Sequence, residues 1–218
     1  MSEKAVAVVD TNVLLNLALP VVDGRPHAPS GADPLKTLLL TYDIHVPERI
    51  LGELTDATGS GDLLSAAAAL VFHAAQHLTP HDVDARSADP LTYSLDHRES
   101  ECIWLANELG ADLFLTDEFN TANYLFINLA LDDRNILFTT PHILCTLATH
   151  EVLPVEYVAA ALTYYVETKG WDAQYIAQLR QQYLSYSLVL LSPSRPDDLC
   201  RRQRGVIDRI AEDCLRGR

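Results

Sequence analysis

The sequence contains very few lysines: Lys4, Lys36 and Lys169 are the three among its 218 residues. Acidic residues outnumber basic ones by 30 to 16, which gives a formal net charge of −14. Binding to a polyanion depends largely on lysine and arginine, so this composition disfavours a broad basic surface for nucleic acid. The acidity indicates either a surface suited to high intracellular salt or a basic protein partner.

Long apolar runs and paired cysteines are also missing. No stretch approaches the roughly 20 apolar residues of a membrane span, and the N-terminus begins a strand without the features of a signal peptide. We therefore expect a cytoplasmic protein that does not contact a membrane. The four cysteines have no CxxC spacing, so reduced and mostly buried thiols are expected rather than a zinc site. They are Cys102, Cys145, Cys200 and Cys214.

Strand-like and helix-like segments alternate over the first two thirds of the chain. Apolar strands are predicted at residues 4–10, 44–46, 112–116 and 135–138. This alternation predicts the α/β class, as a three-layer α/β/α sandwich with a mostly parallel central sheet.

Proline and glycine mark the expected ends of several helices. The helix that starts after Asp10 is predicted to give way to a loop between Pro20 and Pro34, and Pro47 is predicted to open another helix. Residues 79–95 have little periodicity and are predicted to form a loop.

The strand signal fades after Thr140, where successive helices are predicted. We therefore divide the chain into an α/β domain over residues 1–150 and a helical extension over residues 151–218, which packs on the domain or on a partner. Residues 196–218 form an amphipathic pattern with six arginines and five acids. This tail is expected to dock on its own domain or in a homodimer, with RNA contact secondary.

Four carboxylates fall where a strand ends or a helix begins. Asp10 ends the first strand and Asp117 follows the strand at 112–116, while Glu53 and Glu101 lie in helices. Ligands of parallel sheets bind beyond the carboxyl ends of the strands. We therefore predict that these four acids gather at that edge and form a catalytic site.

Carboxylates held close together repel one another unless a proton or a cation lies among them. Oxygen ligands without thiols or imidazoles suit Mg²⁺ or Mn²⁺. Asp10, Glu101 and Asp117 are the predicted metal ligands, and Glu53 completes the site. The residues expected to surround and orient them are Asn12, Glu99, Thr116, Glu118 and Asn120.

Other residues compete for these roles. Glu48 and Asp56 are alternatives to Glu53, and Glu99 is also the capping-box residue after Asp96. A zinc site from the histidines at 73, 77 and 81 is less favoured than surface or core positions, because no carboxylate pattern completes it. The tyrosines of the C-terminal helices have a spacing typical of helix packing, which is favoured over stacking on bases.

The four acidic segments, in their order and spacing, resemble the PIN-domain nucleases. The resemblance extends from residue 5 to roughly residue 150, and it is carried by VVDTNVLLNL, VPERILGELT and RESECIWLANELGADLFLTDE. It implies an α/β/α sandwich with ribonuclease activity that depends on Mg²⁺ or Mn²⁺, often as the toxin of a toxin–antitoxin pair. Asp10, Glu53, Glu101 and Asp117 match the family's acidic quartet.

The predicted function is therefore a divalent-metal-dependent endoribonuclease, either a toxin or an RNA-processing enzyme. The predicted site holds one or two ions. A metal-bound water would attack the scissile phosphate, and a second ion, if present, would lie about 4 Å away and stabilise the leaving oxygen. The expected partners are RNA and an antitoxin or another protein. The alternative is a non-catalytic PIN-like scaffold that binds RNA or a protein. The sequence has no glycine-rich phosphate loop, which disfavours nucleotide hydrolysis.

Overall fold

The computed structural model describes residues 4–27, 32–59, 61–83, 97–118, 121–131 and 134–184. Five parallel strands form one sheet in the order β3-β2-β1-β4-β5. The strands are β1 (Val6–Val9), β2 (Asp43–Pro47), β3 (Leu78–His81), β4 (Leu113–Leu115) and β5 (Leu137–Phe138).

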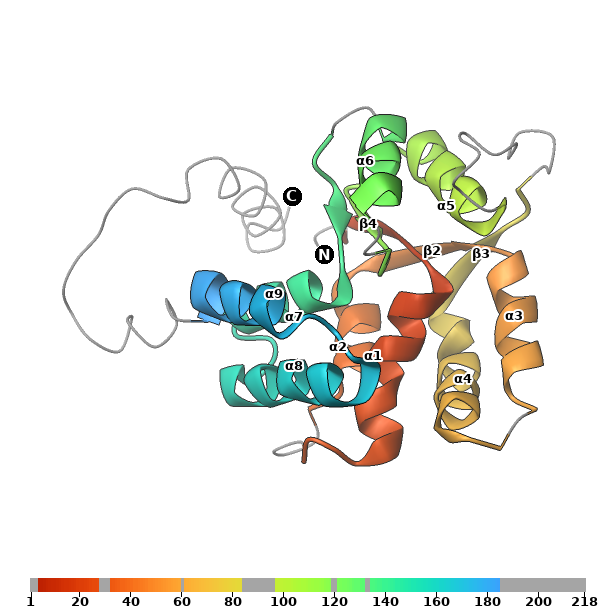
Figure 1. Cartoon of the computed structure of the whole chain (residues 1–218). Helices are drawn as coiled ribbons and strands as arrows, with labels where there is room; N and C mark the ends of the chain where they lie inside the picture. The colour runs from red at the N-terminus through yellow and green to blue at the C-terminus, as the bar shows by residue number, and fades with distance from the viewer. Residues whose placement is uncertain are drawn as a thin grey trace.

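Helices cover both faces of this sheet, which confirms the predicted three-layer α/β/α sandwich. Helices α5 and α6 lie on one side of the sheet, and α1, α2, α4 and α7 lie on the other (Figure 1). The helices are α1 (Thr11–Asp23), α2 (Pro34–Thr41), α3 (Arg49–Ala57), α4 (Leu63–Ala74), α5 (His97–Glu108), α6 (Thr121–Ala130), α7 (Thr140–Thr149), α8 (Val155–Lys169) and α9 (Ala173–Leu179). Two short turns follow α4 and α9, a 3-10 turn over Ala75–His77 and a π-helical turn over Arg180–Leu184.

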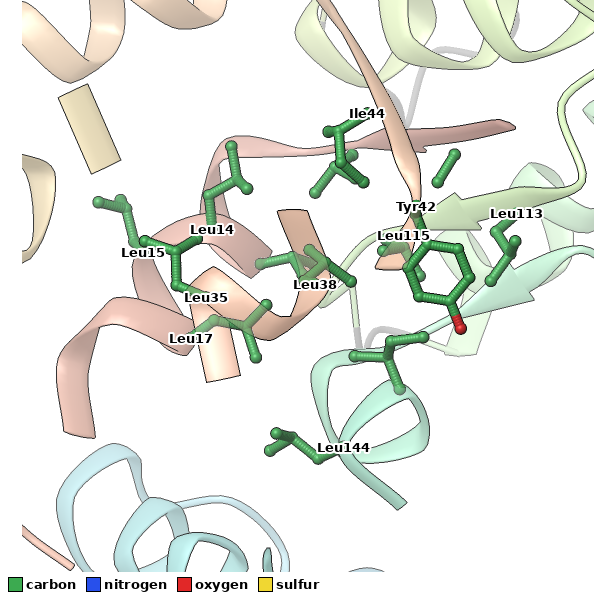
Figure 2. Packing of buried hydrophobic residues seen from close by; sticks show 14 of the residues in the cluster. Leu14, Leu15, Leu17, Leu35, Leu38, Tyr42, Ile44, Leu113, Leu115 and Leu144 are labelled. Atoms are coloured by element: carbon green, nitrogen blue, oxygen red, sulfur yellow. The ribbon is translucent and has the colours of Figure 1, made fainter. Parts of the chain in front are cut away.

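The apolar core extends over both faces of the sheet, with residues of α1, α2 and α7 on one face and of α5 and α6 on the other (Figure 1). Ala7, Ile44 and Leu113 lie side by side across three strands, so they point to the same face of the sheet. Leu14 of α1 and Leu38 of α2 pack toward this face (Figure 2). Strand β1 is apolar in consecutive residues because, as a central parallel strand, it is covered on both faces.

The predicted end of α1 at Pro20 is wrong, because the helix continues through Pro20 to Asp23. Proline has no N–H to donate to the carbonyl four residues earlier, here that of Asn16. The Tyr165 hydroxyl of α8 donates to this carbonyl instead, at 2.8 Å in a buried position. Burial raises the pKa of Tyr165 well above its ordinary value, so the hydroxyl keeps its proton. A residue 149 positions away thus allows the helix to continue.

Two further predicted boundaries differ from the structure. Pro47 is the last residue of β2, and Glu48 is the N-cap of α3. The loop predicted from residue 79 begins instead with β3, which pairs with β2 at the edge of the sheet. Pro80 made a strand look unfavourable in the sequence, because proline is depleted in sheets. On an edge strand, however, proline is tolerated. The remainder of that predicted loop, from residue 84, lies outside the described residues.

Helices α8 and α9 belong to the same apolar core as the sheet, through residues such as Val158, Leu162 and Ile176. Tyr157, Tyr164 and Tyr165 are buried, which confirms packing as their role. Cys102 and Cys145 are buried free thiols, as predicted. Cys200, Cys214 and the tail at 196–218 lie outside the described residues. Within the described ranges, no helix is both long enough and apolar enough to cross a membrane.

We predict that Tyr165→Phe lowers the free energy of unfolding by about 1–3 kcal/mol, because it leaves the buried Asn16 carbonyl without a donor. The loss should be smaller in a Pro20→Ala background, where the restored N–H at position 20 can donate to Asn16. Urea unfolding of the wild type, both single variants and the double variant measures this coupling. Equal losses in the two backgrounds would contradict this role for Tyr165.

Candidate functional site

Two of the predicted acids lie together at the centre of the sheet's carboxyl edge. Val9 pairs with Leu115, the backbone N–H of Asp10 donates to the Leu115 carbonyl at 2.9 Å, and Asp117 follows two residues after β4. The chain leaves β1 toward β2 on one side and later returns as β4 on the other, so the strand order reverses between β1 and β4. Parallel sheets form their ligand-binding crevice at such a switch point.

The Asp10 carboxylate does not cap the helix that it precedes. Asp10 is the N-cap residue of α1, with φ −77° and ψ 152°, yet its side chain accepts no capping hydrogen bond. At three other helices the N-cap aspartate does accept one from the helix backbone: Asp33 in α2, Asp62 in α4 and Asp172 in α9. Asn12, which is predicted to orient this acid, has its Nδ2 3.4 Å from Asp10 Oδ2. Capping therefore does not explain why an aspartate stands at position 10.

Asp117 is held by a network of donors. Its Oδ1 accepts from the Thr140 backbone N–H at 2.7 Å, and its Oδ2 accepts from Asn16 Nδ2 at 2.6 Å and from Thr140 Oγ1 at 2.5 Å. Burial raises the pKa of Asp117, and the hydrogen bonds from Thr140 and Asn16 oppose that rise. These contacts fix the orientation of a carboxylate whose charge the interior disfavours.

Glu53 is joined to the start of α1. The Thr11 hydroxyl, in the residue after Asp10, donates to Glu53 Oε2 at 2.8 Å. Glu53 is half-buried on α3, one residue before the fully buried Leu54. The Glu53 side chain therefore points inward, as predicted, and its hydrogen bond with Thr11 connects it to the end of β1.

Glu101 is the most buried of the four acids, with a side chain only 5% exposed. It lies on α5, and its Oε1 is 2.6 Å from Arg49 Nη2 at the start of α3. A buried carboxylate needs a cation or hydrogen bonds to offset its desolvation, and Arg49 supplies the cation.

Glu53 and Glu101 share a pocket of about 440 Å³ with Arg49. Glu48 and Asp56, the two alternatives to Glu53, line the same pocket. The described residues that line it are Pro47, Glu48, Arg49, Gly52, Glu53, Asp56, Asp82, Val83 and Glu101. This described part of the lining is acidic and offers oxygen donors without an imidazole or a thiol.

The structure therefore arranges the four predicted acids as two pairs. Asp10 and Asp117 lie at the strand ends, whereas Glu53 and Glu101 line the pocket, and the Thr11–Glu53 hydrogen bond connects the pairs. Across the part of the chain that the structure describes, no three His, Cys, Asp or Glu side chains converge as ligands of one ion. The donor chemistry fits a hard divalent cation.

The residues predicted to surround the acids occupy different environments. Thr116 is buried, and its backbone N–H donates to the Phe138 carbonyl at 3.0 Å. Glu99 and Glu118 are half-buried, and Asn120 lies outside the described residues. His73 and His77 are exposed, as favoured for them over a zinc site.

Sequence reasoning missed four partners of the acids, Thr11, Asn16, Arg49 and Thr140, and it missed Asp82 in the lining of the pocket. Asn16 carried one signal, since it is a polar residue within the apolar run of α1 and is only 5% exposed. Thr140 carried none, because its contact with Asp117 depends on how α7 follows β5 in space.

Comparison of the chain with protein-family models, curated proteins and solved structures gives no match.

We predict that Asp117→Asn gains stability over the wild type as the pH rises. A raised pKa means that folded Asp117 binds its proton more tightly than the unfolded chain does, so wild-type stability falls once the pH exceeds the ordinary value of 3.8. Asparagine avoids this loss and keeps the network, because the Thr140 hydroxyl can accept from it and the Asn16 amide can flip. Urea unfolding from pH 4 upward, without divalent ions, measures the difference. A constant difference across this range would contradict the raised pKa.

Proposed function

We propose that this protein is a divalent-metal-dependent endoribonuclease with a PIN-like site. The observation that carries the proposal is the position of Asp10 and Asp117 at the ends of adjacent parallel strands, where the strand order reverses. Acids with oxygen-rich surroundings at this place support a Mg²⁺ or Mn²⁺ site. The resemblance of the four acidic segments to PIN-domain nucleases supports phosphodiester hydrolysis as the reaction.

Asp10, Glu101 and Asp117 would hold the cation, and Glu53 would complete the site. When bound, Mg²⁺ or Mn²⁺ makes a water molecule more acidic and neutralises charge on a phosphate. Asn16 and Thr140 keep the Asp117 carboxylate in one orientation, and Asn12 does the same for Asp10. Because each orienting contact is made before any ligand arrives, little reorganisation is needed at the strand ends.

The composition is consistent with a substrate held mainly through the cation. A net charge of −14 with three lysines opposes the binding of a polyanion such as RNA. Under this proposal the protein acts in the cytoplasm, as a toxin or an RNA-processing enzyme, and binds an antitoxin or another protein. We also propose that the protein forms a homodimer.

A non-catalytic scaffold that binds RNA or a protein is the second candidate. The observation in its favour is that Glu101 pairs with Arg49 while no three-ligand cluster is formed among the described residues. A Mn²⁺ titration separates the two functions, because a scaffold should not bind Mn²⁺ in the low millimolar range or tighter.

We predict that Asp10→Asn lowers the rate of RNA cleavage by at least about 100-fold, since losing a metal ligand should exceed the 10–100-fold typical of losing a residue that supports one. Asp62→Asn is the matched control: it removes the same charge, and asparagine caps α4 as well as aspartate does. Cleavage of a fluorescent RNA with Mg²⁺ or Mn²⁺ compares the two purified variants. Full activity in Asp10→Asn would remove the nuclease proposal.

Glu101→Gln and Glu99→Gln separate two neighbouring acids of α5. Glu101 is buried and lines the acidic pocket, whereas Glu99 is half-buried. We predict that Glu101→Gln reduces the cleavage rate at least about 10-fold more than Glu99→Gln, because only Glu101 is assigned to the cation. The same RNA assay, with circular dichroism to check folding, measures both. A greater loss in Glu99→Gln would reverse the assignment.

A further inference from the structure

Arg49 lies against an acid that the proposed function assigns to the cation. It is the first residue of α3, and its Nη2 is 2.6 Å from Glu101 Oε1 on α5. The two side chains differ sharply in exposure, 47% for Arg49 and 5% for Glu101. Arginine can therefore turn outward into water, whereas the Glu101 carboxylate stays in the interior, where its charge is unfavourable.

The surroundings of this ion pair are acidic. Glu48, Glu53, Asp56 and Asp82 line the same pocket, and Arg49 is the one cationic side chain among the described residues that line it. Like charges gathered in this way raise the free energy of the folded protein unless a cation lies among them. The guanidinium thus occupies the electrostatic position that a divalent ion would take beside Glu101.

We propose that Arg49 is a built-in competitor of the divalent cation for Glu101. This inference rests on the proposed function, because it concerns the regulation of that site. Without the cation, Arg49 neutralises Glu101 and stabilises the pocket. Binding of the cation at Glu101 requires Arg49 to withdraw toward the solvent, which its half-exposed position permits.

The competition sets how much cation is needed to fill the site. Only molecules whose Arg49 has left Glu101 can bind the ion there, so the apparent affinity falls in proportion to their fraction. If about one molecule in ten is in that state, removing the guanidinium tightens binding about 10-fold. The site would then fill only when the cation is abundant, while the empty pocket stays folded.

Thermal unfolding at increasing Mn²⁺ concentration tests the proposal with a readout other than cleavage. Without Mn²⁺, Arg49→Gln should melt below the wild type, because Glu101 loses its counter-ion. Mn²⁺ should raise the melting temperature of Arg49→Gln by more than that of the wild type, with a midpoint about 10-fold lower in concentration. Arg25→Gln is the matched control: it removes the same charge from the surface pair with Asp23 and should behave as the wild type.

The Glu101→Gln background separates local competition from a general change in charge. There the Arg49→Gln substitution should no longer tighten Mn²⁺ binding. Arg49→Lys keeps the charge but loses the planar guanidinium, so its Mn²⁺ midpoint should lie between those of the wild type and Arg49→Gln. Arg49→Lys replaces Arg49→Gln in the experiment if Arg49→Gln does not fold.

The outcomes distinguish this proposal from the proposed function. Equal Mn²⁺ midpoints in wild type and Arg49→Gln would overturn the competition and leave the metal site standing. If Arg49→Gln still tightens Mn²⁺ binding in the Glu101→Gln background, the competition for Glu101 is overturned as well. If Mn²⁺ stabilises no variant, both the competition and the metal-dependent function are wrong. If the competition is observed but no RNA is cleaved, the nuclease proposal alone is wrong.

Discussion

The central place of β1 in the parallel sheet is the constraint on which the candidate site depends. Strand β1 pairs with β2 on one side and β4 on the other, and all run in the same direction. Because parallel strands end at the same edge, residues more than 100 positions apart in the sequence, Asp10 and Asp117, follow neighbouring strand ends. Helix α1 begins at that edge as well, so Thr11 and Asn16 can reach Glu53 and Asp117. The site is thus a consequence of strand order.

Asn16 connects helix α8 to this edge of the sheet through two hydrogen bonds. Pro20 has no N–H to bond the Asn16 carbonyl, so this carbonyl accepts a hydrogen bond from the Tyr165 hydroxyl instead. The Asn16 side chain donates a hydrogen bond to Asp117. Tyr165 stacks on Trp171, with ring centroids 4.5 Å apart, which holds the tyrosine in place. Helix α8 therefore does more than cover an apolar face: it supports the residue that orients one of the acids.

Asp117, Glu53 and Glu101 each have a partner that offsets the cost of placing negative charge away from water. Asp117 accepts hydrogen bonds from Asn16 and Thr140, Glu53 accepts one from Thr11, and Glu101 pairs with Arg49. Hydrogen bonds orient a carboxylate without cancelling its charge, whereas a guanidinium cancels it. A divalent ion bound at Glu101 would therefore have to displace a charged group of the protein.

The sequence by itself determined the fold class and the segments that bear the acids. Alternating apolar strands and amphipathic helices predicted the sandwich, and Asp10 and Asp117 were placed at the strand ends because an apolar strand visibly stops before each. Local patterns could not reveal the continuation of α1 past Pro20, since Tyr165 supplies the missing hydrogen bond from α8. Edge strand β3 could not be predicted either, because Pro80 argues against a strand locally and only the pairing with β2 makes this segment one. Tertiary structure alone decided that Glu101 pairs with Arg49 and Asp117 with Thr140, because these contacts join elements that are distant in sequence and depend on how the layers pack.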